Sequence, residues 1–315
     1  MRSNYSYFLL FVFLLQFESN IAADFKVIRQ ITGFVETNCY LIYDLKSNEA
    51  AIIDPGWRVD TIINFIEENN LNLKYIFLTH GHTDHSFYVS ELKRKFPEVK
   101  LCINRIDFNQ MFTQFQWFKD TYGQEFIEKE RSNPEHKSYI DFDPGSIGIP
   151  DIFVEDNQSY KLGSTEIKTI HTPGHSPGEI CYYTKNVLFS GDVLLYRTVG
   201  GIHNQGSSGN DLIKSVKKLY EIFPDSTIIY PGHGQISDIG SEKRENENMS
   251  LDNVRQVSQV NANDDHSIAI KKAATDLEFR ENYRQFVGKS FEPLGPFRGD
   301  LKALLEYNIQ KCGQI

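Results

Sequence analysis

Histidine and aspartate side chains gather in one short stretch of the sequence, "THGHTDH", from Thr79 to His85. Three of the nine histidines of the chain stand there, at His80, His82 and His85, and Asp84 precedes the last of them. Imidazole and carboxylate groups are ligands that zinc, iron and manganese accept in proteins. Because His80 and His82 alternate across one residue, an extended loop can turn both rings toward one ion. Asp84 and His85, at the start of an expected helix, point toward a second ion.

Three further residues of the same kinds follow strand-like runs and stand beside glycine. His175 lies in "TPGH", Asp192 in "SGD" and His233 in "PGHG". Glycine permits the tight turns that aim such side chains into a cleft. The two oxygens of Asp192 can bridge two ions, and two ions about 3.5–4 Å apart bring the pKa of a shared water near 7. One histidine alone is more simply a hydrogen-bonded core residue, but the whole set in this order predicts a metal centre.

The residues between these clusters predict the elements that must position them. Runs rich in β-branched and aromatic residues predict strands at 25–31, 39–43, 50–53, 75–78, 99–103, 160–162, 166–170, 179–183, 187–189 and 227–230. Apolar residues at helical spacing predict helices at 62–66, from Asp84 through Phe96, and at 212–223. This order indicates an α+β protein, a four-layer αββα sandwich in which two sheets pack face to face between helices.

Three segments depart from this pattern. Residues 1–23 combine an early cation, a short apolar run and a small-residue end, which predicts a signal peptide and a secretory or extracellular location. Residues 24–250 then form the main domain, which carries the histidine and aspartate motifs. Within them, residues 105–150 carry an aromatic stripe at helical spacing, which either packs on the core or forms a lid over the site. Residues 251–315 turn polar and then helical, so we expect a small helical C-terminal extension.

The composition of the chain argues against some classes of binding partner and against predicted disulfides. The net charge of −9 argues against nucleic acid or an anionic membrane as a partner, although the simpler interpretation is that this charge only keeps the protein soluble. No stretch after residue 23 is apolar enough to span a bilayer. The four cysteines form no C-x-x-C pair, so their spacing predicts no disulfide. Cys39, Cys102 and Cys181 lie in apolar runs, and we expect them to be buried free thiols.

Taken together, these motifs resemble those of the metallo-β-lactamase-fold superfamily, nearest to its glyoxalase II-like hydrolases, which cleave hydroxyacylglutathione. The pattern T-H-x-H-x-D-H is met by residues 79–85, T-P-G-H by 172–175, S-G-D by 190–192, P-G-H-G by 231–234 and I-D-P-G by 53–56. The resemblance covers about residues 25–250. It is highly specific for the fold and the metal site, and much less specific for the substrate.

The resemblance implies two divalent metal ions, zinc first, with iron or manganese as alternatives. It assigns the first ion to His80, His82 and His175, the second to Asp84, His85 and His233, and the bridge to Asp192. Asp54 would orient a ligand imidazole by accepting its outer N–H, or would only form the turn ahead of Pro55. The implied reaction is hydrolysis of a thioester, ester or lactone bond in a small acyl substrate by a metal-bridging hydroxide. Asp84 and Asp192 are its expected catalytic carboxylates.

The stretch after S-G-D departs from the pattern of many such proteins. They carry Gly-Arg-Thr-Asp there, whereas this chain reads "TVGGIHNQG", so an arginine and an aspartate are missing. His203 stands near that place and is a candidate substrate contact, as is Arg197. The simpler interpretations are a loop histidine and a surface arginine.

Two other functions compete with hydrolysis. A persulfide dioxygenase-like oxidoreductase would use one iron at the positions of His80, His175 and Asp192, and the altered stretch argues against it. A binding module that has lost activity would be expected to lack ligands, and none is missing here. The sequence leaves the acyl group, the leaving group, the metal and the oligomeric state open.

Overall fold

The computed structural model describes residues 16–17 and 25–249 of the 315-residue chain. The predicted C-terminal extension, 251–315, lies outside the described residues. So does the predicted signal peptide, apart from Gln16–Phe17, which form the short strand β1. Both stay predictions. None of the described helices has the length and apolar character that crossing a bilayer requires.

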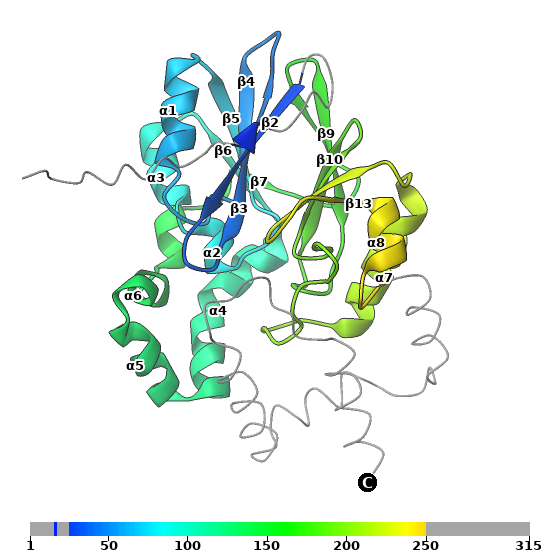
Figure 1. Cartoon of the computed structure of the whole chain (residues 1–315). Coiled ribbons are helices and arrows are strands. Elements are labelled where there is room, and N and C mark those ends of the chain that lie inside the picture. The colour runs from blue at the N-terminus through cyan, green and yellow to red at the C-terminus, as the bar shows by residue number, and fades with distance from the viewer. Residues whose placement is uncertain (1–15, 18–24, 250–315) are drawn as a thin grey trace, which may run out of the picture.

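The first of two mixed sheets holds the strands of the N-terminal half (Figure 1). Its strands follow one another in chain order: β1 (Gln16–Phe17), β2 (Phe25–Thr32), β3 (Thr37–Asp44), β4 (Glu49–Ile53), β5 (Asn72–Phe77), β6 (Lys100–Ile103) and β7 (Ile152–Phe153). The pairs from β1 to β4 are antiparallel, and those from β4 to β7 are parallel. The three parallel pairs need crossover connections, and helices lie in all three of them.

The second sheet holds the strands of the C-terminal half. In spatial order they are β13 (Ser237–Asp238), β12 (Ile228–Pro231), β11 (Val187–Gly191), β10 (Ile180–Thr184), β9 (Thr165–His171) and β8 (Ser159–Leu162). Only β11 and β12 pair in parallel, and α7 (Gly209–Ile222) lies in the connection between them. The Ser208 hydroxyl caps this helix by accepting a hydrogen bond from Asp211 N.

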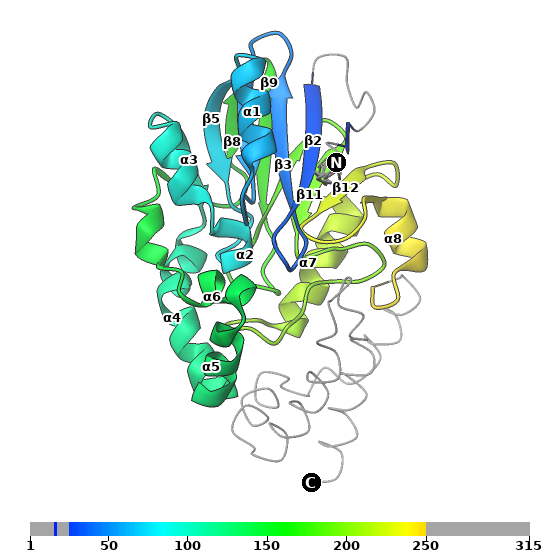
Figure 2. The same cartoon turned by 60° about the vertical axis from the view of Figure 1, so that its left-hand side comes forward.

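Helices cover the outer faces of both sheets (Figures 1 and 2). On the first sheet these are α1 (Asp60–Glu68) and α3 (Val89–Lys95); on the second they are α7 and α8 (Ile239–Glu245). The remaining helices are α2 (Thr83–Ser86), α4 (Arg105–Tyr122), α5 (Gln124–Ser132), α6 (Pro134–Ile140) and a 3₁₀ turn, η1 (Pro144–Ile147). The predicted αββα sandwich is therefore confirmed.

Three apolar clusters fill the spaces between the four layers. On β3, Cys39 and Leu41 face α1 and α3, whereas Tyr40 and Ile42 face the second sheet. Both faces of this strand are buried, which explains why its sequence is apolar without a break. The three described cysteines, Cys39, Cys102 and Cys181, are buried and free, as expected from their apolar surroundings.

Replacing Ile52 by valine should lower the free energy of unfolding by about 1 kcal/mol, because one buried methyl group is lost and a small cavity remains. Ile52 lies on β4 and is fully buried under α1 and α3. The matched control is Ile149→Val, because Ile149 is 79 % exposed. Urea unfolding of both variants measures the difference; equal midpoints would contradict the packing described for this cluster.

One predicted helix is wrong in part. The helix expected from Asp84 through Phe96 is two helices, α2 and α3, with Phe87 and Tyr88 between them. The Tyr88 N–H donates to Pro55 O (2.9 Å), so it does not continue the helical ladder. This break lets α2 stay at the histidine cluster while α3 packs on the sheet.

The segment 105–150 is helical and groups at one end of the sandwich (Figure 2). Of its aromatic stripe, Phe108 packs on the core and Met111 is buried, but Phe112 is 52 % exposed. The side chains of Phe115 and Phe118 lie outside the described residues. The first turns of α4 are thus core packing, the first of the two expected roles.

Candidate metal centre

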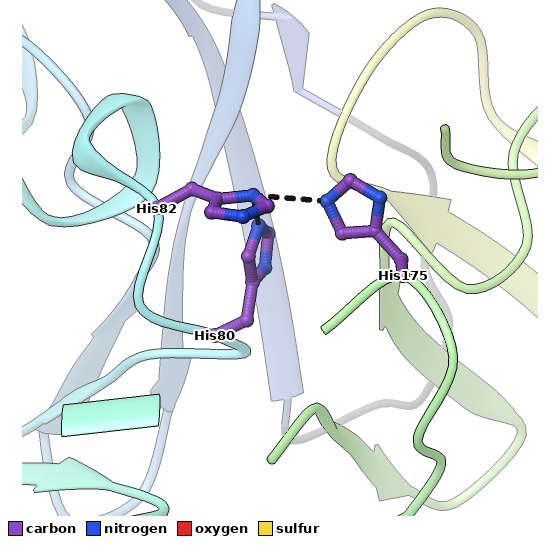
Figure 3. Close-up of side chains that lie close together, drawn as sticks. All are labelled: His80, His82 and His175. Carbon is purple, nitrogen blue, oxygen red and sulfur yellow. Dashed lines mark hydrogen bonds between the residues drawn. The ribbon is translucent and has the colours of Figure 1, made fainter. Parts of the chain in front are cut away.

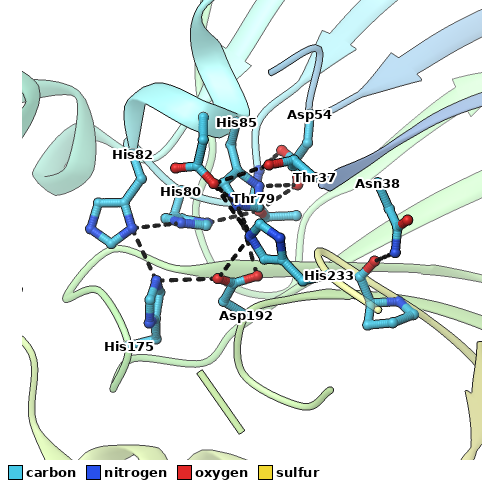
Figure 4. A network of polar contacts seen from close by, with 12 residues as sticks. Thr37, Asn38, Asp54, Thr79, His80, His82, His85, His175, Asp192 and His233 are labelled. Carbon is cyan, nitrogen blue, oxygen red and sulfur yellow. Dashed lines mark hydrogen bonds and ion pairs between the residues drawn. The ribbon is translucent and has the colours of Figure 1, made fainter. Parts of the chain in front are cut away.

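The histidines and aspartates of the sequence motifs lie close together in the folded chain (Figure 4). Strand β5 runs into the extended loop of His80 and His82 and then into α2. The loops that follow β9, β11 and β12 carry His175, Asp192 and His233. Both sheets present these strand ends to the same edge, so loops far apart in the sequence come together there.

His80, His82 and His175 form the first ligand group (Figure 3). The Nδ1 atom of His82 lies 2.9 Å from His80 Nε2 and 3.0 Å from His175 Nε2. His80 and His175 are buried, and His82 is half-buried. Three ring nitrogens therefore converge on one point, as the alternation of His80 and His82 predicts.

Asp84, His85 and His233 form the second ligand group. The Nε2 atoms of the two histidines lie 3.2 Å apart, and Asp84 Oδ2 lies 3.4 Å from His85 Nε2 and 3.3 Å from His233 Nε2. The Thr37 hydroxyl donates to the same Asp84 oxygen (3.0 Å). The N-terminal end of β3 thereby fixes the carboxylate in this position.

Asp192 stands between the two groups. Its Oδ2 lies 3.5 Å from His175 Nε2 in the first group and 3.5 Å from His233 Nε2 in the second. Its Oδ1 lies 3.8 Å from His85 Nε2 and has no hydrogen-bond partner among the described residues, although it is buried. The bridging position predicted for Asp192 matches this geometry.

The outer nitrogens of four rings face fixed acceptors. His175 Nδ1 donates to Gly201 O (2.6 Å) and His233 Nδ1 to Val35 O (3.0 Å). His85 Nδ1 donates to Asp54 Oδ2 (3.0 Å). His80 Nδ1 lies 3.0 Å from the Thr79 hydroxyl. An outer nitrogen that carries the proton leaves the inner nitrogen with a free lone pair, which is the form that binds a metal.

Asp54 accepts hydrogen bonds from two residues of the site, His85 and Thr79. Besides His85, it accepts hydrogen bonds from the Thr79 backbone N–H (2.8 Å) and hydroxyl (2.7 Å). Because that hydroxyl proton points to Asp54, the Thr79 oxygen is free to accept from His80. The geometry thus gives Asp54 the orienting contact that was expected. It also has a positive φ of 52°, as a turn residue can have, so the geometry is compatible with both expected roles.

The pKa values of the histidines shift in opposite directions in the two ligand groups. Burial lowers the pKa of His80 and His175 well below the ordinary value and that of His82 to about 4, so these rings are neutral at pH 7. Burial also disfavours charge on His85 and His233. Nevertheless, the neighbouring carboxylates raise the pKa of both rings above the ordinary value. The carboxylates thus favour positive charge where the second group converges.

The donor set fits two divalent ions. Five inward-facing imidazoles and two carboxylates are the ligand types that zinc accepts, and iron and manganese also use them. Lone pairs 2.9–3.0 Å apart, as in the first group, repel each other unless a proton or a metal cation lies between them. The unpaired Oδ1 of Asp192 needs a positively charged neighbour for the same reason.

A family model described as "Metallo-beta-lactamase superfamily" matches residues 32–233, which contain all seven predicted ligands. The chain belongs to this superfamily. Among its relatives is the hydroxyacylglutathione hydrolase GloC of Haemophilus influenzae, 34 % identical over 219 residues, which are 69 % of this chain and 93 % of that protein. The sequence resemblance to metallo-β-lactamase-fold proteins is thereby confirmed.

Two further similar proteins extend the comparison. The probable polyketide biosynthesis zinc-dependent hydrolase BaeB of Bacillus velezensis is 27 % identical over 196 residues, covering 62 % of this chain and 72 % of that one. The crystal structure of the BLEG-1 B3 metallo-beta-lactamase matches with a TM-score of 0.55 and 28 % identity, over 70 % of this chain and 97 % of that one.

The two candidate substrate residues differ in position. His203 is half-buried and close enough to His82 and His175 to influence the pKa of both. Burial in turn lowers the pKa of His203 to about 4. The Arg197 guanidinium instead forms ion pairs with Glu242 (2.7 Å) and Glu245 (2.6 Å) of α8. The structure therefore places His203 in the surroundings of the first ligand group, whereas the contacts of Arg197 brace α8.

The motifs did not reveal Glu179, which is fully buried beside the bridging ligand. Its Oε1 accepts a hydrogen bond from Asp192 N (2.7 Å) and lies 3.8 Å from His80 Nδ1. Burial and the charge of Asp192 raise the pKa of this carboxyl well above its usual range. The only feature of the sequence that could have indicated this buried carboxylate is a glutamate at the start of an apolar strand.

Proposed function

We propose that this superfamily member is a binuclear metal-dependent hydrolase that cleaves a thioester, ester or lactone bond of a small acyl substrate. The observation that carries the proposal is the position of Asp192 between two complete ligand groups. A one-iron oxidoreductase would need only His80, His175 and Asp192. The oriented second group, Asp84, His85 and His233, has no role in that chemistry.

Two bound divalent ions would supply an activated water and polarise the substrate carbonyl. The protein holds the imidazoles in the required tautomer, and Asp192 fixes the two groups relative to each other. Asp84 is the carboxylate that we assign as proton acceptor. Its side chain is 24 % exposed, against 9 % for Asp192 and 2 % for Asp54, so it is the one that water and substrate reach best. Two relatives support this reaction class. GloC is a hydroxyacylglutathione hydrolase, and BaeB is a probable zinc-dependent hydrolase, which makes zinc the first metal to test.

Metal analysis of the protein, purified without added metal, should find about two ions per chain, zinc or zinc with iron. The same protein should hydrolyse at least one member of a panel of thioesters and lactones, and removal of metal by a chelator should abolish that activity. The control is restoration of activity by added zinc. One iron per chain, with oxygen uptake on a persulfide and no hydrolysis, would overturn the proposal in favour of the oxidoreductase.

A further inference from the structure

A buried carboxylate on the first turn of α4 reaches the metal centre from outside the family motifs. Asp107 is 1 % exposed and accepts three hydrogen bonds. Its Oδ2 receives them from Gly81 N (3.0 Å) and the Ser176 hydroxyl (2.6 Å), and its Oδ1 from Gly178 N (2.6 Å). All three donors belong to loops that carry metal ligands.

These donors are immediate neighbours of the first ligand group. Gly81 stands between His80 and His82, and Ser176 directly follows His175. The two loops follow strands of different sheets, and Asp107 joins them beside a backbone hydrogen bond from Ile180 N to Thr79 O (2.8 Å). The second ligand group is held by other partners, namely Asp54, Val35 and Thr37.

Both loops touch the backbone of α4 where they meet Asp107. A Cβ atom on Gly81 would lie 2.7 Å from Asp107 O, and one on Gly178 would lie 2.6 Å from Asp107 Oδ1. Real Cβ atoms do not approach other atoms so closely, so glycine permits the contact at both positions. The hydrogen bonds therefore depend on a close fit between the helix and the two loops.

The start of α4 is itself fixed to the sandwich, so it can hold Asp107 in a constant position. Asn104 Oδ1 accepts a hydrogen bond from Ile106 N (2.9 Å) at the start of α4, and Asn104 Nδ2 donates to Val154 O (2.9 Å) beside β7. Met111, one turn further along, is buried in the core against the first sheet. Asp107 is thus held by the sandwich and in turn holds both loops.

We propose that Asp107 is a positioning residue for the first metal ion, and that it sets the distance from His80 and His82 to His175. This inference rests on the proposed two-ion site. Loss of the carboxylate removes three hydrogen bonds that hold the two loops to α4 and leaves the bond from Ile180 N to Thr79 O, so the loops loosen relative to each other and affinity for the first ion falls. The ligands of the second ion keep their own partners, so its affinity is retained.

A purely structural aspartate would behave differently, and Asp44 is the matched control. It is also fully buried and accepts several hydrogen bonds, from Lys46 N (3.0 Å), Ser47 N (2.8 Å) and Ser164 N (3.2 Å). It lies at the opposite end of β3 from Thr37 and hence far from the ligands. Asp44→Asn should destabilise the fold without a preference for either ion.

Zinc titration of the full-length protein against a competing chelator tests the proposal. His82→Ala and His233→Ala first identify which binding step belongs to which ligand group. Asp107→Asn should then weaken the step lost in His82→Ala about tenfold, the lower end of the range for outer-shell partners, and leave the other step within about threefold. If Asp107→Asn does not fold, Ser176→Ala removes one of the three hydrogen bonds and should weaken the same step by a smaller factor.

The outcomes separate this inference from the proposed function. Equal weakening of both steps by Asp107→Asn, or of neither, overturns the positioning role while two wild-type steps still support the binuclear site. A single wild-type step that His82→Ala abolishes contradicts the binuclear site. Its sensitivity to Asp107→Asn, with none to Asp44→Asn, would still support the positioning role.

Discussion

Replacing Asp192 by asparagine should reduce kcat/KM for the best substrate at least about 10³-fold, and the metal content should fall below two ions per chain. The carboxylate lies within 3.5 Å of ligand nitrogens in both groups, so its loss disturbs both ions at once. An amide is isosteric but neutral, and its NH₂ group cannot bind a cation. Losses of this size are found when an aspartate that organises a catalytic set is removed.

The control for this experiment is Asp225→Asn. The side chain of Asp225 is 68 % exposed and pairs with Lys243 on the surface, so the same change there should leave activity and metal content unaltered. Elemental analysis and steady-state kinetics measure both variants. Two ions per chain and hydrolysis within tenfold of wild type in Asp192→Asn would contradict the bridging role.

Most strands along the chain and the residues of the ligand set were predictable because both depend on local sequence, whereas the two-residue strands β1, β7 and β13 were not predicted. Apolar runs that end in glycine-containing motifs locate the strand ends, and every predicted ligand lies in one of the two groups or, as Asp192, between them. The break between α2 and α3 was not predictable. It depends on the hydrogen bond from Tyr88 N to Pro55 O, which joins residues 33 positions apart and has no periodic signature.

The residues that support the ligands could be predicted only in part. Asp54 was suggested by its motif, but Asp107 and Glu179 were not. Their partners are mainly backbone N–H groups, at Gly81, Gly178 and Asp192. Every residue except proline offers such a donor, so side-chain identity carries no information about the pairing. Only the fold shows which N–H groups a buried carboxylate meets.

The contacts of Asp54 lead to the second large effect. Asp54→Asn should weaken binding of the second ion about 10–100-fold, the range typical of outer-shell partners. Asp54 Oδ2 accepts from both His85 Nδ1 and the Thr79 hydroxyl, and Oδ1 accepts from Thr79 N. An amide has only one oxygen, so its NH₂ group would face one or more of these donors. His85 then loses the negatively charged oxygen of residue 54 that orients its ring.

This substitution also separates the two roles of Asp54, because asparagine forms the same turn. Asp54 has a φ of 52°, a conformation that asparagine adopts as readily as aspartate. If turn formation were the whole role, Asp54→Asn would bind zinc as the wild type does. If the orienting bond matters, activity falls at limiting zinc and recovers in excess zinc, since the ligands themselves remain. A loss of activity that excess zinc does not restore would contradict a role through metal affinity, and would place the effect of Asp54 on the chemical step.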